Sequence, residues 1–431
     1  MSATFTEEQA RAYMHKLLGA MSQAGGSDLF IAAEYPPSMK SHGAMQPLTS
    51  QKLNAEVTRM LAQSLMNDRQ RAEFAKELEC NFAISIPGVS RFRVNVYVQQ
   101  QCVGMVIRTI ASEIPNFEKL KLPVILKDVV MQKRGLVLVV GATGSGKSTS
   151  LAAMIDHRNR TSAGHIITVE DPVEYVHVSQ KSLVTHREVG VDTHSWHHAL
   201  KNTLRQAPDV ILIGEIRDAE TMEHAIAFAE TGHLCLGTLH ANSASQTIER
   251  IINFFPEERR AQLLMDLSAN LRAIVSQRLV RRENAEGRAA AIEILLNTPT
   301  IAERIFQGEF HEIKGIMAKS RELGMCTFDA ALFDLYDAGV IGFDEALRNA
   351  DSTNELRLNI KLKSDRGVPA QSDFMSLSID EGPTPEEIAE QHHAAQQQQH
   401  VLRRQKEDAQ LEQLREKKRA AEAAAAAVAK R

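Results

Sequence analysis

Residues 141–149 read Gly141-Ala142-Thr143-Gly144-Ser145-Gly146-Lys147-Ser148-Thr149, which matches the phosphate-binding pattern G-x-x-x-x-G-K-[ST] at every fixed position. Glycine lacks a Cβ, so such a loop can wrap closely around phosphate oxygens, and the helix that follows adds its positive N-terminal end. In this pattern Lys147 reaches the β- and γ-phosphates and the hydroxyl of Ser148 binds Mg²⁺. We therefore predict that these nine residues bind a nucleoside triphosphate together with Mg²⁺.

The segments on either side of this loop have the composition that such a site requires. Residues 136–140 are five apolar residues in a row, which is typical of a strand buried on both faces of a parallel sheet. Residues 148–157 have a helical composition. The order strand, glycine loop, helix favours a nucleotide site over a glycine-rich turn without a ligand.

Length and composition set the broad class of the protein. The 431 residues are enough for two or three domains, and 43% hydrophobic with 24% charged residues is ordinary for a globular protein. A net charge of −4 gives no reason to expect nucleic-acid binding. No apolar run approaches the length of a membrane span, and residues 1–20 are too polar for a signal peptide, so we expect a cytoplasmic protein.

Cysteine and histidine spacing gives no sign of a second metal site. The four cysteines (Cys80, Cys102, Cys235 and Cys326) form no C-x-x-C pair, so neither a zinc site nor a disulfide framework is indicated. The adjacent histidines at 197–198 and 392–393 lack further ligands at metal-binding spacing along the chain. The sequence therefore predicts no metal other than Mg²⁺.

The chain before the loop predicts a separate α+β domain over residues 1–122. Apolar residues recur at helical spacing in residues 6–21, and residues 53–66 and 68–79 are expected to form two more helices. Strands are expected at residues 28–33, 81–86, 90–99 and 102–110. In residues 90–99, Phe92, Val94, Val96 and Val98 alternate with polar residues or tyrosine, as in a strand with one buried face.

From residue 136 the pattern changes to alternating strands and helices, which predicts a nucleotide-binding α/β domain over residues 123–363. Further strands are expected at residues 166–169, 210–213 and 234–239, with helices at 194–205 and 218–230. Residues 261–279 and later segments, to about residue 359, are also expected to be helical. Ligands of such folds lie at the carboxyl ends of the strands.

Residues 364–431 form a third, low-complexity region. This tail has acidic and then basic stretches, four consecutive glutamines and an alanine run, but few large apolar residues. It cannot bury a core of its own, so we expect a disordered or partly helical, solvated extension. A segment that docks on a partner is the alternative.

Acidic residues and a histidine follow the expected strands on the ligand side. Gly214 stands at the strand end where an aspartate is usual, so Glu215 is left to bind the metal or activate water. Residues 169–174, Val-Glu-Asp-Pro-Val-Glu, place further carboxylates after another strand, ending at Glu174. His240 falls at the carboxyl end of the strand 234–239, where it could sense the γ-phosphate, whereas His233 is better explained as a packed structural residue.

Taken together, these segments resemble the secretion and pilus motor ATPases, and among them the PilT/PilU retraction ATPases of bacterial type IV pili. The resemblance covers roughly residues 6–359 and includes the phosphate loop, the acidic segment 170–174, residues 213–218 (Ile-Gly-Glu-Ile-Arg-Asp) and the histidine segment that ends at His240. It implies a PAS-like N-terminal domain, a RecA-like ATPase domain that hydrolyses ATP with Mg²⁺, and a hexameric ring.

The resemblance also implies roles for individual residues. Glu174 is similar to the catalytic glutamate of the family, and Glu215 to its Mg²⁺-associated glutamate. The arginines Arg91, Arg93 and Arg108 resemble N-domain arginines that reach a nucleotide across a domain interface, although on their own Arg91 and Arg93 would be assigned to the solvated face of an edge strand. Arg205 and Arg217 resemble arginines near the phosphates.

Two departures from the PilT pattern resemble PilU, the accessory retraction ATPase. Residues 301–309, Ile-Ala-Glu-Arg-Ile-Phe-Gln-Gly-Glu, lack the A-I-R-N-L-I-R-E segment of PilT proteins, and the tail exceeds a PilT length. The implied partners are further copies of the chain, a paralogous retraction ATPase and the inner-membrane pilus platform, which would hold the protein at the cytoplasmic face of that membrane.

Three other functions remain open at this point. A pilus extension or type II secretion ATPase usually has a four-cysteine zinc motif, and the scattered cysteines argue against it. A regulatory subunit that binds ATP but turns over little is compatible with the motifs. A small-molecule kinase is remote, because no acceptor pocket can be named.

Overall fold

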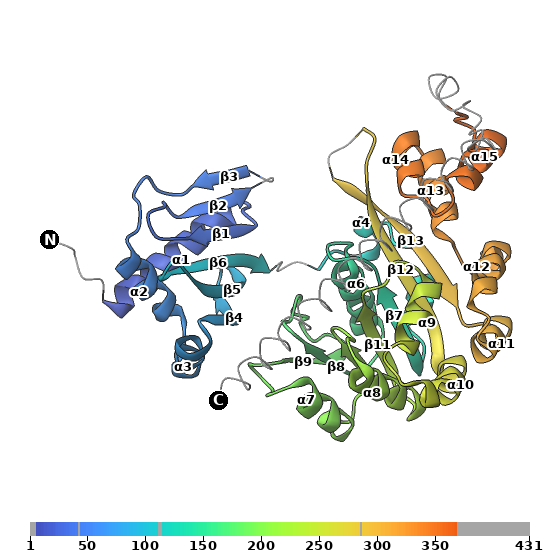
Figure 1. The fold of residues 1–431 in the computed structure, drawn as a ribbon, viewed down its shortest axis with the longest axis horizontal. Coiled ribbons are helices and arrows are strands. Elements are labelled where there is room, and N and C mark those ends of the chain that lie inside the picture. Colours follow the sequence, from blue (N-terminus) through green and yellow to red (C-terminus); the bar gives the residue numbers. More distant parts are fainter. Residues whose placement is uncertain (1–5, 42–43, 111–113, 285–286, 369–431) are drawn as a thin grey trace, which may run out of the picture. The chain divides into compact units, whose positions relative to one another are not determined.

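The structure is a computed structural model that describes residues 6–41, 44–110, 114–284 and 287–368 (Figure 1). The tail predicted at residues 364–431 therefore lies outside the described residues from 369 onward. Within the described part of the chain, no helix combines the length and the apolar character needed to cross a membrane.

Residues 7–110 fold as an antiparallel sheet covered by helices, which confirms the expected α+β character of this region. The sheet has the order β3-β2-β1-β6-β5-β4. Its strands are β1 (Asp28–Ile31), β2 (Ser38–Ser41), β3 (Ala44–Pro47), β4 (Glu79–Ile86), β5 (Ser90–Gln99) and β6 (Cys102–Ile110). The helices are α1 (Glu7–Gln23), α2 (Ala55–Leu65) and α3 (Asp68–Glu77). Helix α1 begins with a capping box between Thr6 and Gln9, and α2 packs against both α1 and β6.

The alternation in β5 produces the buried face that was predicted. Phe92, Val94 and Val96 are fully buried, while Arg93 between them is exposed. However, β5 pairs with β4 on one side and β6 on the other, so it is not the edge strand that Arg91 and Arg93 on their own would suggest. The short strands β2 and β3 were not predicted, because neither contains a β-branched or aromatic residue that would favour a strand.

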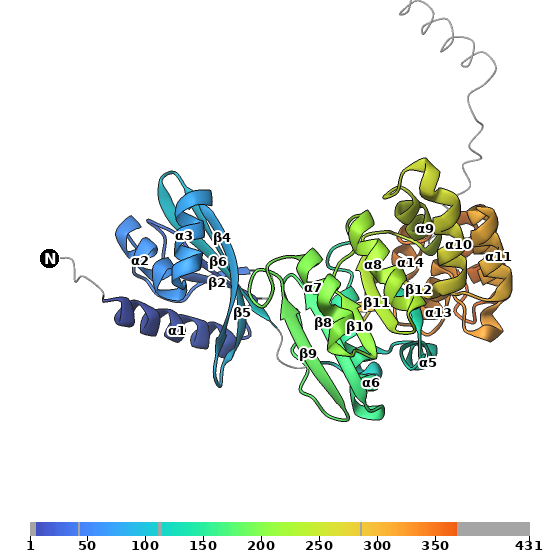
Figure 2. The same ribbon diagram turned by 90° about the horizontal axis from the view of Figure 1, so that it is seen from below.

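The second sheet has seven strands in the order β13-β12-β7-β11-β10-β8-β9. Its strands are β7 (Gly135–Val140), β8 (Gly164–Glu170), β9 (Ser182–Glu188), β10 (Val210–Ile213), β11 (Leu234–Leu239), β12 (Leu271–Arg281) and β13 (Arg288–Leu296). All neighbours are parallel except the pair β12–β13. Figure 2 shows the unpredicted strand β9 at one edge, beside β8.

The run of apolar residues in β7 follows from helices packing on both faces of this sheet. Leu136, Leu138 and Val140 point into one hydrophobic cluster, and Val137 and Val139 point into another on the opposite face. The helices of this region are α4 (Phe117–Leu120), α5 (Ile125–Val130), α6 (Lys147–Thr161), α7 (Trp196–Thr203), α8 (Ala219–Glu230), α9 (Ala244–Ile252) and α10 (Arg260–Asn270). Alternate side chains of one strand thus anchor both helical layers.

The helical prediction for residues 261–279 and the later segments is wrong for Leu271–Arg281 and for Arg288–Leu296, which form the strands β12 and β13. Helix α10 ends at Asn270, and β12 then pairs in parallel with β7. The β-branched residues Ile274 and Val275 favour a strand, and β12 is buried between β7 and β13. In the described residues after β13, the α-helices are α11 (Pro299–Gln307), α12 (Phe310–Lys319), α13 (Phe328–Asp337), α14 (Phe343–Arg348) and α15 (Thr353–Lys363). Helix α13 packs on β13. Figure 1 shows α11 to α15 on the side of the sheet where β13 lies.

Candidate functional site

The loop Gly141–Gly146 connects the carboxyl end of β7 to the first turn of α6, as predicted. Gly146 is the N-cap of α6 and has φ +86°, a left-handed conformation that side chains disfavour. A Cβ at this position would also lie 2.7 Å from Nε2 of Gln277. Both facts require glycine at the start of the helix, where the free N–H groups of the first turn face the loop.

Lys147 begins α6 and folds back over the loop. Its ammonium donates hydrogen bonds to the carbonyl oxygens of Gly141, at 2.8 Å, and Ala142, at 3.0 Å. Burial lowers the pKa of Lys147, and the nearby Glu215 carboxylate partly opposes this. The lysine therefore lies inside the loop, where a phosphate oxygen could replace the carbonyl partners.

The loop contains a polar atom that fits an anionic ligand. In the described part of the chain, the hydroxyl of Ser145 is buried without a hydrogen-bond partner. Buried donors normally find an acceptor, because an unpaired one costs about 1–3 kcal/mol. An orphaned hydroxyl beside Lys147, in a loop of glycines, fits a bound phosphate, whereas Ser148 at the start of α6 is exposed and accessible to a metal ion.

A residue that the sequence analysis missed holds the loop in place. The side-chain amide of Gln277, on β12, donates to the carbonyl of Ser145 at 2.8 Å and accepts from the hydroxyl of Ser150 at 2.7 Å. Gln277 was missed because its segment was assigned to a helix. The β-branched residues Ile274 and Val275, followed by the polar Ser276 and Gln277, were the available signal.

Two cavities open on the loop and bring further basic residues to it. One, of about 200 Å³, lies beside Gly146 and Thr149 and includes Arg282 in its lining. The other, of about 290 Å³, lies against residues 141–145 and includes Arg278. Arg288 lines both cavities. None of these three arginines was predicted, because they lie on or beside β12 and β13, which were not predicted either.

Glu215 contacts two of the other predicted site residues, Arg217 and His240. It follows β10 and Gly214, and its Oε2 accepts a hydrogen bond from Arg217 at 2.6 Å. Its Oε1 lies 3.2 Å from Nε2 of His240, which follows the neighbouring strand β11. The hydrogen bond from Arg217 lowers the pKa of Glu215, and the charges of Arg217, His240 and Lys147 act in the same direction. Glu215 is therefore held as a carboxylate on the loop side of the sheet.

The acidic segment 170–174, which begins at the last residue of β8, contains one buried and one exposed glutamate. Glu170 ends β8, and burial raises its pKa to about 7. The backbone N–H of Glu174 donates to its carboxyl at 3.4 Å, while the side chain of Glu174 is exposed. Gly214 leaves room for Glu170, since a Cβ on Gly214 would lie 3.1 Å from the Cα and Cγ of Glu170.

The structure does not gather the other predicted arginines at the loop. Arg91 pairs with Glu188 at the end of β9, and the Nε of Arg108 donates to Asp28 at 2.8 Å. Arg93 is exposed.

Arg205 lies near the amino ends of the strands, whereas the phosphate loop lies at their carboxyl ends. It is in the turn Leu204–Gln206, whose last carbonyl lies 3.0 Å from Nδ1 of His165 at the amino end of β8. The phosphate loop follows the carboxyl end of β7. Within one chain, Arg217 is thus the only one of the five predicted arginines with a described contact to Glu215.

This site, a phosphate loop and a Glu215–His240 pair at the carboxyl edge of a parallel sheet, defines a P-loop ATPase. The sequence model of the family "Type II/IV secretion system protein" matches residues 7–323. The chain therefore belongs to this family, and the relatives below confirm the resemblance to its PilT/PilU members.

Two relatives and one crystal structure define the similarity more closely. The chain is 59% identical over 350 residues to the type IV pilus ATPase PilU of Pseudomonas aeruginosa, covering 81% of this chain and 92% of PilU. It is 42% identical over 335 residues to the type IV pilus retraction ATPase PilT of the same organism, covering 78% of this chain and 97% of PilT. The crystal structure of the pilus retraction motor PilT with bound ADP matches with a TM-score of 0.74 and 37% identity, over 80% of this chain and 98% of that one.

Proposed function

We propose that this protein is a motor subunit that hydrolyses ATP to drive type IV pilus retraction, in the accessory role of a PilU-type ATPase. The observation that carries the proposal is the 59% identity to PilU over 92% of that protein's length. The intact phosphate loop and the Glu215–His240 pair support hydrolysis in addition to binding.

Different residues of the site would bind the phosphates of ATP and the Mg²⁺ ion. The backbone N–H groups of residues 141–149 and the Lys147 ammonium would hold the phosphates, with the unpaired Ser145 hydroxyl as a further donor. The Ser148 hydroxyl and the Glu215 carboxylate would hold Mg²⁺. When bound, the metal ion would neutralise charge on the β- and γ-phosphates.

The remaining roles belong to residues around this loop. Glu174, whose exposed carboxylate follows Glu170, would accept a proton from the attacking water. Glu170 would hold the segment 170–174 in place by accepting a hydrogen bond from the backbone N–H of Glu174. His240 would report the state of the γ-phosphate to Glu215, its neighbour at 3.2 Å. Arg217 keeps Glu215 ionised.

We further propose a hexameric ring in which Arg91, Arg93 or Arg108 reaches the nucleotide of an adjacent subunit. Arginines supplied in trans are a common device for stabilising charge in phosphoryl transfer. The proposed partners are a paralogous retraction ATPase and the inner-membrane pilus platform, at the cytoplasmic face of that membrane. The domain division proposed from the sequence, at about residue 122, would then separate the arginines from the phosphate loop.

The alternatives differ in features that can be checked. A secretion or extension ATPase with a four-cysteine zinc motif is disfavoured, since Cys80 lies in β4 and Cys235 in β11, and both are buried and free. A regulatory subunit with little turnover differs from a motor only in rate.

Two measurements test the proposal. Cells that lack this protein, its paralogue or both should differ in pilus retraction, and restoring the wild-type chain but not Lys147→Ala should recover the lost part. Phosphate release by the purified chain gives the rate. If deleting this protein changes retraction neither in wild-type cells nor in cells that lack the paralogue, the retraction role is rejected. Binding of ATP without measurable phosphate release would favour the regulatory subunit.

A further inference from the structure

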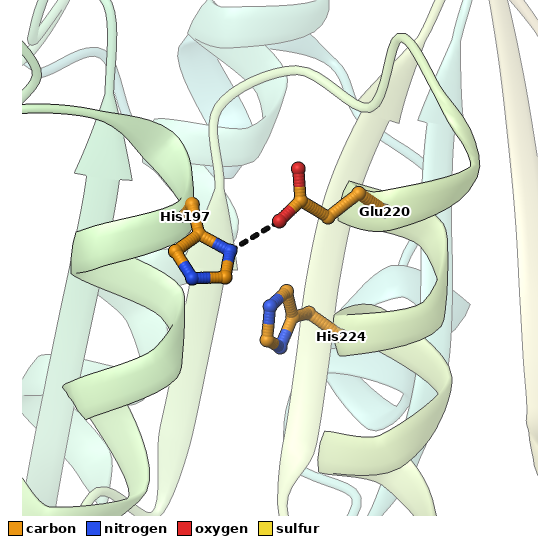
Figure 3. Close-up of side chains that lie close together, drawn as sticks. All are labelled: His197, Glu220 and His224. Carbon is orange, nitrogen blue, oxygen red and sulfur yellow. Dashed lines mark hydrogen bonds and ion pairs between the residues drawn. The ribbon is translucent and has the colours of Figure 1, made fainter.

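Two neighbouring helices outside the phosphate loop bring together two histidines and a glutamate. His197 lies in the first turn of α7, and Glu220 and His224 lie four residues apart on α8. Residues four apart share one face of a helix, and α7 and α8 contact each other. Figure 3 shows the three side chains pointing into the space between the two helices. This contact is not visible in the sequence, where His197 has no further ligand at metal-binding spacing.

The geometry of the three side chains is that of a ligand group. Each offers one ligand atom, and these atoms all lie within 4.8 Å of one another. His197 Nδ1 and Glu220 Oε1 form a hydrogen bond, and the rings of His197 and His224 have centroids 6.3 Å apart (Figure 3). His224 also stacks on Phe228 at 5.9 Å, which restrains its ring, while His197 and Glu220 are exposed and can adjust their rotamers.

Two imidazole nitrogens and one carboxylate oxygen are a donor set that zinc uses with a fourth position left to water. Zinc–ligand bonds of about 2.0–2.2 Å place ligand atoms roughly 3.3 Å apart in a tetrahedron, so the atoms here need only a small approach. Magnesium prefers oxygen ligands in an octahedron and does not match this set. We propose that His197, Glu220 and His224 form a binding site for a divalent transition-metal ion, with Zn²⁺ as the probe.

Such an ion would tie α7 to α8 close to the active-site segment. The N-cap of α8 is Asp218, which directly follows Arg217 and lies three residues after Glu215 in the chain. A metal ion that bridges the helices therefore stabilises the segment that leads from β10 into α8. The predicted effect is a higher melting temperature in the presence of Zn²⁺, because a ligand that binds only the folded state stabilises it.

The test uses the full chain, freed of any purification tag and stripped of metal by a chelator. Zn²⁺ is titrated calorimetrically in excess Mg²⁺, and the melting temperature is measured with and without Zn²⁺. The wild-type chain should bind one Zn²⁺ at this site and melt at a higher temperature with it. His197→Ala and His224→Ala should each weaken binding at least about tenfold and so reduce the thermal shift at a given Zn²⁺ concentration. Glu220→Gln, which keeps the shape but removes the charge, should also weaken binding.

Two controls separate this site from others. His198→Ala changes the adjacent residue of the same helix and should bind Zn²⁺ as the wild type does. Glu215→Ala removes the proposed Mg²⁺ ligand and should also leave this Zn²⁺ site intact. A Co²⁺-loaded wild-type chain should have the visible absorption of a tetrahedral site, which His224→Ala should lose. If the wild type binds no Zn²⁺, or if the three ligand variants bind it unchanged, then the cluster is only a hydrogen-bonded contact between helices and the proposal fails.

Discussion

The side-chain amide of Gln277 donates a hydrogen bond to the main-chain carbonyl of Ser145, with 2.8 Å between the two heavy atoms. The same side chain accepts from the hydroxyl of Ser150 at 2.7 Å, so β12 is attached to both the phosphate loop and the first turns of α6. Removing one partner of a buried hydrogen bond leaves the others unpaired, which costs about 1–3 kcal/mol.

Gln277→Ala should therefore destabilise the chain by about 1–3 kcal/mol and weaken ATP binding, because the loop loses its lateral support. Chemical denaturation and nucleotide titration measure the two effects. Gln262→Ala on α10, where the amide is exposed and pairs with Asp266, is the matched control and should change neither. Unaltered ATP affinity in Gln277→Ala would show that the loop holds its shape alone.

Lys147→Ala should abolish ATP hydrolysis while the fold persists. The ammonium donates hydrogen bonds to the carbonyls of the loop, and Lys147 is not a member of the hydrophobic clusters around β7, so its removal leaves these clusters intact. Loss of this charge in the transition state should cost about 3 kcal/mol or more, a rate decrease of at least about 100-fold. Phosphate release and circular dichroism measure rate and fold, with exposed Lys319→Ala as the control. A variant rate above half of the wild-type value would contradict the assignment.

Glu174 and Glu215 should have separable roles. Glu215 is held ionised by Arg217 and lies near Lys147, whereas Glu174 is exposed after β8 and contacts Glu170 through its backbone. Glu174→Gln should slow hydrolysis and leave the Mg²⁺ dependence of ATP binding nearly unchanged. Glu215→Ala should also raise the Mg²⁺ concentration needed for half-maximal rate. Rates measured across a Mg²⁺ titration decide this, and identical profiles for the two variants would reject the division.

Glu170 should make the chain less stable as the pH rises. Burial raises its pKa from 4.5 to about 7, so the folded state keeps a proton that the unfolded state has already lost above pH 4.5. Stability from this group is therefore greatest at low pH and falls as the pH rises toward and through 7. Glu170→Gln stays neutral throughout and retains an acceptor for the N–H of Glu174.

The difference between the two chains isolates this effect. Between pH 6 and pH 8, wild type should lose about 1 kcal/mol of unfolding free energy relative to Glu170→Gln. Denaturant unfolding at both pH values, without nucleotide or Mg²⁺, provides the comparison. Parallel pH profiles for the two proteins would mean that Glu170 ionises normally in the folded chain.

Arg108 should act on the nucleotide of a neighbouring subunit if the proposed ring forms. Its side chain is 67% exposed and pairs with the buried carboxylate of Asp28 on the same sheet, which also accepts a hydrogen bond from the hydroxyl of Ser27 and so keeps a partner when the arginine is removed. Arg108→Ala should thus fold normally but hydrolyse ATP slowly. Asp28→Asn breaks the same ion pair and keeps the arginine, so it should stay active.

Mixed rings distinguish action in trans from action within one chain. Rings of Arg108→Ala alone and of Lys147→Ala alone should be nearly inactive. When subunits of both kinds exchange, some interfaces join an intact loop to an intact arginine, and activity should partly return. If exchange is confirmed and activity does not return, a tandem dimer with both changes in one half decides between action in cis and a need for several intact sites.

Residues 136–149 were sufficient to predict the centre of the fold. Five apolar residues in a row require a strand with both faces covered, and the spacing of the glycines, Lys147 and Ser148 specifies a loop that binds phosphate. The structure confirms both the strand and the loop conformation. The same reasoning located Glu215 and His240, because the carboxyl ends of neighbouring parallel strands meet at one edge of a sheet.

The sequence alone could not predict contacts between segments that are distant along the chain. Gln277 supports the loop only because β12 pairs with β7, and that pairing depends on long-range packing, which local composition does not record. His197 lacks a ligand along its own segment and gains Glu220 and His224 only when α7 packs on α8. Local spacing thus determined which residues could bind phosphate, whereas tertiary packing decided which other side chains would stand beside them.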